Sequence, residues 1–110
     1  MGRRYSTKIV LQDAAQASGN GTPANVAGLG NCVVQVSGTF SARVNLEGTI
    51  DNVTWYQLAP TVVETGAAGG GTTVPILWSC DTRGLALVRA PVADYVSGSV
   101  TVTLLSNGGA

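Results

Sequence analysis

Few residues of this chain could carry out chemistry, and their spacing matches no known catalytic pattern. The 110-residue sequence contains no histidine, which is the usual base beside a serine or cysteine nucleophile. The carboxylates that could pair in glycoside hydrolysis are scattered along the chain: Asp13, Glu47, Asp51, Glu64, Asp81 and Asp94. Most of them lie at expected turns, where Asp is common for structural reasons. We therefore expect a protein that is not an enzyme and that needs no cofactor.

A calcium site would have to be built from turn residues. Asp51 and Asn52 are adjacent, and Asp81 or Asp94 could join them. The chain lacks the dense run of oxygen ligands that calcium-binding loops have. We expect no metal site.

The aromatic residues allow two interpretations. Tyr56, Trp78 and Tyr95 could form a platform on which a sugar stacks, or could anchor a partner protein. Alternatively, Trp55 and Trp78 fill the core of a domain that has only one Phe. We expect Trp55 to be in the core, because it follows a hairpin turn, and Tyr95 to be exposed beside a loop.

Two cysteines, Cys32 and Cys80, are too far apart in sequence for a CxxC redox or zinc motif. They could form a disulfide between strands or remain buried thiols that act as small apolar residues. The amino terminus has no apolar stretch of signal-peptide length, so we favour the thiols.

The charge composition indicates a surface made for protein contacts. Formal net charge is zero, and only 11% of residues are charged, against roughly 25% in ordinary domains. Arg3 and Arg4 form the one short basic cluster, so the electrostatic signature of a nucleic-acid binder is missing. Arg89 lies within an apolar segment and needs a partner if buried, either a group of the same chain or a carboxylate of a neighbouring subunit. No apolar run approaches the ~20 residues of a transmembrane helix, and we expect no membrane association.

The elements that position these residues are β-strands. In residues 38–50 the even positions are mainly apolar (Phe40, Ala42, Val44, Leu46, Gly48, Ile50) and the odd positions polar. Because side chains alternate across a strand, the run predicts one long strand with a buried face. Asp51-Asn52 predicts a turn, after which residues 53–58 return as the second strand of a hairpin.

Further strands are expected at residues 7–12, 25–27, 32–37, 61–65, 73–80, 85–90 and 97–104. Cys32, Val34 and Val36 should share one face, and residues 91–95 are expected to form a loop or an irregular crossing. The fold class is therefore all-β, a two-sheet antiparallel β-sandwich of about seven to eight strands, with a small closed β-barrel as the alternative. Residues 1–110 form a single domain, and residues 1–24 could be an extended arm.

Two segments carry a resemblance to known proteins. Residues 34–55 (VQVSGTFSARVNLEGTIDNVTW) and residues 87–89 with 95–104 (LVR and YVSGSVTVTL) are similar to small β-sandwich structural proteins of tailed bacteriophages. Asn52 replaces the usual Gly of that pattern and still suits a turn with positive φ. The resemblance covers roughly half of the chain and rests on structural motifs rather than on chemistry.

The resemblance implies a component of the virion, made in the host cytoplasm, and most closely a capsid decoration (cement) protein. Such a protein would bind the assembled shell as a homo-oligomer, with the major capsid protein or other virion proteins as partners. The alternatives are a carbohydrate- or receptor-binding module of a tail fibre or cell surface, and a tail structural domain. Contacts are expected in residues 2–20, 66–72 and 85–89, and the interface residues predicted individually are Arg3, Arg4, Tyr5, Leu85, Leu87, Arg89 and Tyr95.

Overall fold

Twelve strands make up the described part of the fold. The computed structural model describes residues 5–108, and no helix occurs among them. The strands are β1 (Tyr5–Ala15), β2 (Ala24–Asn25), β3 (Asn31–Ser37), β4 (Phe40–Asn45), β5 (Glu47–Thr49), β6 (Tyr56–Gln57), β7 (Thr61–Val62), β8 (Gly71–Thr72), β9 (Ile76–Asp81), β10 (Leu87–Arg89), β11 (Val92–Gly98) and β12 (Val100–Gly108). The all-β prediction is thereby confirmed.

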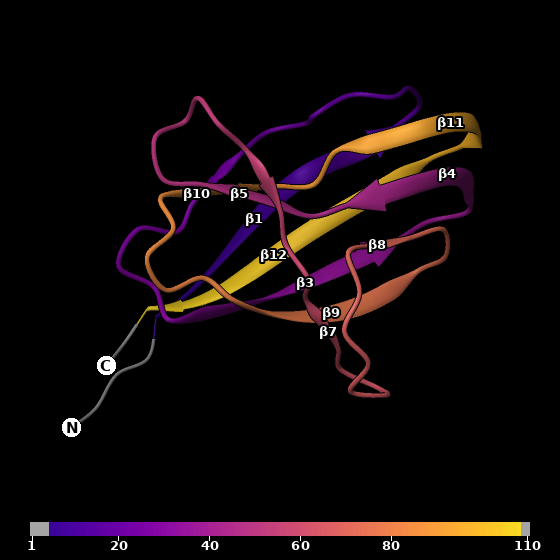
Figure 1. Ribbon diagram of the computed structural model, residues 1–110. Helices are drawn as coiled ribbons and strands as arrows, with labels where there is room; N and C mark the ends of the chain where they lie inside the picture. Colours follow the sequence, from indigo (N-terminus) through magenta and orange to yellow (C-terminus); the bar gives the residue numbers. More distant parts are fainter. Residues whose placement is uncertain (1–4, 109–110) are drawn as a thin grey trace.

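The strands form two layers, as expected for a sandwich. One layer is a five-stranded antiparallel sheet in the order β1-β12-β3-β9-β7. The facing strands form a four-stranded sheet, β2-β10-β5-β6, and a three-stranded sheet, β11-β4-β8. In Figure 1, β4, β5, β10 and β11 lie above β3 and β9. Within residues 5–108 the sheets do not close into a barrel, so the barrel alternative is wrong.

The core lies between the layers and follows the alternation of the sequence. Val100, Val102 and Leu104 point inward from β12, and Cys32, Val34 and Val36 do so from the neighbouring β3. From the facing layer, alternate residues of β4 and the residue after it complete this core: Ala42, Val44 and Leu46. The inward faces predicted for these strands are confirmed.

The long strand expected over residues 38–50 is divided into β4 and β5, which lie in different sheets. β4 pairs with β11 and β8, whereas β5 pairs with β10 and β6. Leu46, which lies between them, is buried and belongs to neither strand. Leu58 N–H donates a hydrogen bond to the Leu46 carbonyl at 2.8 Å. The alternation continues through the break because Leu46 and Gly48 still face inward, so the pattern could not reveal it.

The hairpin after β5 is confirmed, and its turn is longer than expected. β6 pairs with β5 through Glu47–Gln57 and Gly48–Tyr56, and Asn52 has φ of 61°. Asn adopts a positive φ more readily than most residues do, so Asn52 suits this position of the turn.

Two expectations about irregular segments were wrong. Residues 91–95 were predicted to be a loop or crossing, but most of them belong to β11, which pairs with β4 across a register shift between Ala93 and Ser97. The positive φ of Asp94, 53°, accompanies that irregularity. Residues 5–15 are not a separate arm, because they form β1 and pair along β12 from Tyr5–Gly108 to Ala15–Val100.

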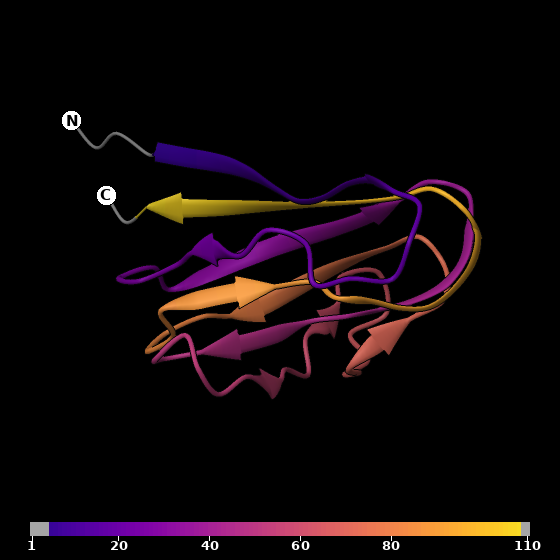
Figure 2. The ribbon, with the colours of Figure 1, turned by 90° about the horizontal axis from the view of Figure 1, so that it is seen from above.

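Two sharp corners join the layers at one end of the sandwich. The chain passes from β3 to β4 at Gly38 and from β11 to β12 at Gly98, with φ of 111° and 87°. Ser99 N–H donates to the carbonyl of Thr39 at 3.0 Å, so the two corners are held against each other. Figure 2 shows them curving side by side at the end opposite the chain termini. A Cβ on Gly98 would lie 2.1 Å from the Thr39 carbonyl oxygen, so this corner requires glycine both for its φ and for the close approach.

Candidate interaction surface

The outward side of the five-stranded sheet carries a group of partly exposed apolar side chains. Strand register places Lys8, Leu105 and Val33 in one cross-strand row and Val10, Thr103, Gln35 and Leu77 in the next. Leu77 is 40% exposed and Leu105 is 43% exposed. We call the following set the outer face: Lys8, Val10, Val33, Gln35, Leu77, Thr103 and Leu105.

A hollow of about 280 Å³ lies in the middle of the outer face. It is lined by the set above without Val10. Lys8 is the ionisable residue of its lining, so the hollow is an apolar depression with one charge at its border. Cross-strand neighbours on a regular sheet keep nearly fixed positions, and the surface is therefore formed before any partner arrives.

The outer face was not predicted from the sequence, although a signal was present. In β1, β3, β9 and β12 the positions that should be polar are interrupted: Val10, Val33, Leu77 and Leu105 each stand beside apolar core residues. A strand that is apolar on both faces reads as a continuous apolar run and indicates cover on both sides.

Of residues 85–90, Leu87–Arg89 form β10, which is in the interior of the four-stranded sheet. Val88 is buried in the core, whereas Leu85 and Leu87 are half-buried. Leu85 packs beneath the sheet, since a Cβ on Gly48 would lie 2.9 Å from its Cδ1. With Tyr56, Leu58 and Ile50 it helps to line a second hollow of about 280 Å³ beside the β5–β6 hairpin. Leu85 therefore packs against the core and also lines this hollow.

Arg89 finds its partners within the same chain. Its Nε donates to Glu47 Oε1 at 2.8 Å, and Nη2 lies 2.8 Å from the same oxygen. Its Cζ also lies 4.1 Å from the ring centre of Trp55. The predicted pairing of Arg89 with a carboxylate of the same chain is thus confirmed. With Glu47 as its partner, Arg89 does not need a carboxylate of a neighbouring subunit.

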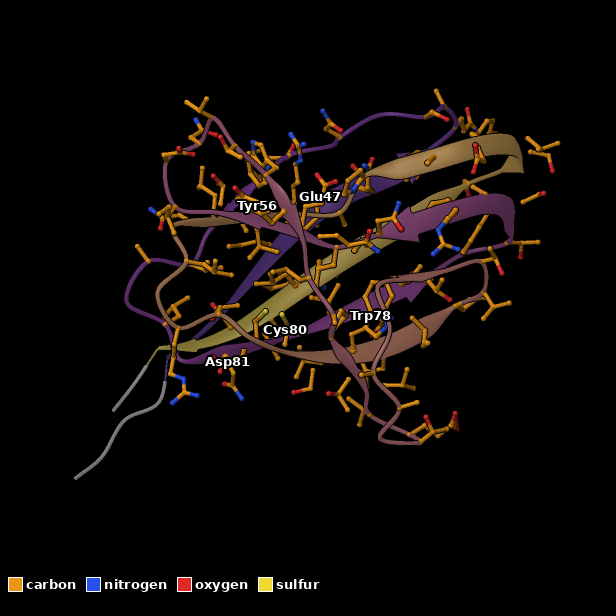
Figure 3. The ribbon with its side chains drawn as sticks, in the orientation of Figure 1. Glu47, Tyr56, Trp78, Cys80 and Asp81 are labelled. Atoms are coloured by element: carbon orange, nitrogen blue, oxygen red, sulfur yellow. The ribbon has the colours of Figure 1, made fainter. Side chains whose placement is uncertain are left out.

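The aromatic residues divide differently from the prediction. Trp78, for which core and exposed platform were both open, is 1% exposed and lies in the core. Trp55 is half-buried and packs against Arg89, so its placement in the core was wrong. Tyr95, expected to be exposed, is half-buried, and its hydroxyl donates to the carbonyl of Gly98 at 2.6 Å. Figure 3 shows Tyr56 and Trp78 in different layers of the sandwich. The predicted sugar platform does not form, because Trp78 is inaccessible.

The other predicted contact segments are only partly covered by the structure. Arg3 and Arg4 lie outside the described residues, as does the side chain of Tyr5. The glycine-rich segment 66–72 follows a turn, is held by backbone hydrogen bonds and ends in β8, which pairs with β4. Val62 N–H donates to the carbonyl of Ala67 and Gly66 N–H to that of Val62.

Two carboxylates have pKa values below their usual range. Asp51 Oδ1 accepts hydrogen bonds from the N–H groups of Thr54 and Val53, 2.9 Å each, and these bonds lower its pKa by stabilising the charged form. Hydrogen bonds from the Arg83 side chain and backbone lower the pKa of Asp81 to about 2. Both carboxylates are engaged by the chain itself. Among residues 5–108, no three His, Cys, Asp or Glu side chains are grouped as metal ligands would be.

The fold and this surface together define a β-sandwich with an apolar hollow on the outward side of its five-stranded sheet. The family model for XepA matches residues 5–104, and the chain belongs to the XepA family. None of the curated proteins matches it. No helix in the described part of the chain is long and apolar enough to cross a membrane.

Two crystal structures share the fold. One is the SPBc2 prophage-derived protein YomS, with a TM-score of 0.90 and 23% identity over 97% of this chain and 96% of that one. The other is the PBSX exported protein XepA, with a TM-score of 0.91 and 16% identity over 97% of this chain. The chain spans only 39% of the length of that XepA chain.

Proposed function

We propose that this protein is a non-enzymatic structural protein of a bacteriophage or prophage, which works by binding other protein chains through the outer face. The observation that carries the proposal is the apolar hollow on the outer face, which lies on a regular five-stranded sheet. Apolar side chains at the centre of a pre-formed surface are the usual source of protein–protein affinity. The XepA family assignment and the prophage origin printed for YomS support the phage setting.

In its specific form, the proposal is that the protein decorates an assembled phage shell as a homo-oligomer. A protein that binds only the assembled shell stabilises it by mass action, since dissociation of the shell would require release of the bound protein. The low charge of the chain suits repeated contacts in a symmetric assembly. A tail location would use the same surface in a different assembly.

Sedimentation of a lysate from the native source tests this proposal. We expect the protein to travel with a particle of megadalton size beside a major shell or tail protein, and a salt or chelator wash will show whether it can be removed. Recovery as a small species in the lysate or the culture medium would contradict the virion role. The medium is included because one protein of the same fold is described as exported.

A pair of variants tests the surface. Leu77→Asp places a charge on the outer face and should abolish binding to the particle. Val96→Asp places the same charge at an exposed apolar residue of β11, outside the outer face, and should leave binding unchanged. Equal binding by both variants would show that the outer face is not the contact surface.

A further inference from the structure

The two cysteines are directly opposite each other on adjacent strands. Cys32 of β3 and Cys80 of β9 are register partners in the five-stranded sheet. Both side chains point into the core, and both are buried and reduced. Figure 3 shows Cys80 on the inner side of its strand.

The hydrogen-bond pattern specifies how close their backbones are. Thr82 N–H donates to the carbonyl of Gly30 at 3.2 Å, which extends the register by one hydrogen-bonded pair beyond Asn31–Asp81. Hydrogen-bonded and non-bonded pairs alternate in an antiparallel ladder, and the cysteines are two positions further along each strand. They therefore also form a hydrogen-bonded pair, in which the Cα atoms are about 5.5 Å apart.

The other side of β9 gives the same result independently. Val63 N–H donates to the carbonyl of Leu77 at 3.0 Å, so Leu77 directs its backbone polar groups toward β7. Residues of the opposite parity, which include Cys80, then direct theirs toward β3. A Cα separation of about 5.5 Å is within the range of natural disulfides, and both Cβ atoms lie on one face of the sheet.

We propose that Cys32 and Cys80 are a site of covalent modification, at which an intrachain disulfide forms between β3 and β9 when the protein meets a small-molecule disulfide. A thiolate of one cysteine attacks the small disulfide, which forms a mixed disulfide and releases one thiol. The second cysteine then attacks the mixed disulfide and releases the other thiol. Two protein thiols are oxidised, and one small disulfide is reduced to two thiols.

The environment of the pair favours the intrachain disulfide over a stable adduct with a reagent. The Cys32 thiol is hydrogen-bonded to Cys80 and buried, and both effects raise its pKa, so it reacts slowly with reagents in the folded state. The neighbouring thiol is already in place to resolve a mixed disulfide. In a reducing cytoplasm the pair remains thiols, and outside the cell it becomes a disulfide. This inference does not depend on the proposed function, because it concerns only the geometry of one sheet.

The experiment uses the full chain, purified in a reducing buffer and then incubated or refolded with glutathione disulfide. Free thiols are alkylated under denaturing conditions, and the intact mass and the thermal midpoint are measured. We expect an unalkylated monomer that is lighter by about 2 Da, the two hydrogens lost in forming the bond. The bond closes a loop of about 50 residues, which should raise the midpoint by roughly 10 °C or more.

Two alkylated cysteines, stable glutathione adducts or disulfide-linked dimers would overturn the proposal. An intrachain bond that leaves the midpoint unchanged or lowers it would also do so, because the native geometry would then not accommodate the bond. Cys80→Ala is the matched control. It should keep one alkylatable thiol, and its midpoint should not respond to the oxidant.

Discussion

The two outward surfaces of the sandwich are both built from antiparallel strands, but their most informative side chains differ in how they are paired and exposed. On the four-stranded sheet, Arg89 is bound by Glu47 and covered by Trp55. On the five-stranded sheet, Val10, Leu77 and Leu105 are open to solvent around an apolar hollow. On the first surface the arginine completes its contacts within the chain, whereas the second has no such pair and presents apolar side chains that are 40–43% exposed.

This difference shows why the residue that stood out in the sequence was not the best guide to the contact surface. A lone charge within an apolar strand attracts notice, but a chain usually satisfies such a group internally because an unpaired buried charge is costly. Partly exposed leucines and valines on a sheet cost much less free energy than an unpaired buried charge, so the chain need not cover them with its own residues. Their grouping therefore indicates a partner better than an isolated arginine does.

The largest effect on stability should come from replacing a tryptophan, and the two tryptophans compare a core position with a surface position. Trp78→Ala removes a side chain that is 1% exposed and should lower the free energy of unfolding by about 3–5 kcal/mol. Trp55→Ala removes a half-buried ring and its contact with Arg89, and should cost about 1–2 kcal/mol. Urea unfolding of both variants measures the difference, and equal losses would contradict the placement of Trp55 at the surface.

The next effect concerns the pair that completes the four-stranded surface. Glu47→Gln removes the charge opposite Arg89, where the two side chains are 26% and 20% exposed. We expect a loss of about 1–2 kcal/mol, between the values for exposed and fully buried pairs. A double-mutant cycle with Arg89→Met isolates the coupling, and a coupling near zero would mean that the ion pair does not stabilise this surface.

Acid should weaken the fold through Asp81, whose folded-state pKa of about 2 lies below the ordinary value of 3.8. Since the pKa is depressed on folding, its contribution is complete above about pH 4 and is lost as the pH falls toward about 2. Thermal unfolding between those limits should show a declining midpoint. Asp81→Asn and Arg83→Ala should each reduce the decline, and an unchanged slope in both would rule out this pair as a source of it.

The smallest effect on stability should occur on the outer face, where the effect on binding is largest. Leu105→Thr replaces a side chain that is 43% exposed and should change the free energy of unfolding of the free protein by about 0.5 kcal/mol. The same variant should bind the particle less well in the sedimentation assay. A large loss of stability without a loss of binding would assign Leu105 to the fold instead of the contact surface.

The fold class was predictable because alternation is a direct consequence of strand geometry. Val100, Val102 and Leu104 repeat at every second position and all three are buried. Asn52 likewise marked a turn that the structure builds with a positive φ. These features depend on local sequence, which is what an alternation pattern reports.

The missed features depend on which segments become neighbours. The division at Leu46 preserves alternation while moving the chain from one sheet to another. In β11, Asp94 interrupts the pattern, so a strand resembled a loop. The outer face combines residues of β1, β3, β9 and β12, and only strand order and register bring them together.

The pairing of Tyr5 with Gly108 determines how the molecule would respond to a pulling force. The first and last described residues are neighbours on the edge strand β1 and the antiparallel β12 beside it, at the same end of the sheet. Tension applied through these two positions acts along the interstrand hydrogen bonds, which are perpendicular to the strands. The bonds between β1 and β12 would then break one after another, as in a zipper, and not all at once in shear. An assembly that must withstand mechanical load would therefore gain strength by gripping the sheet across its face rather than by its ends.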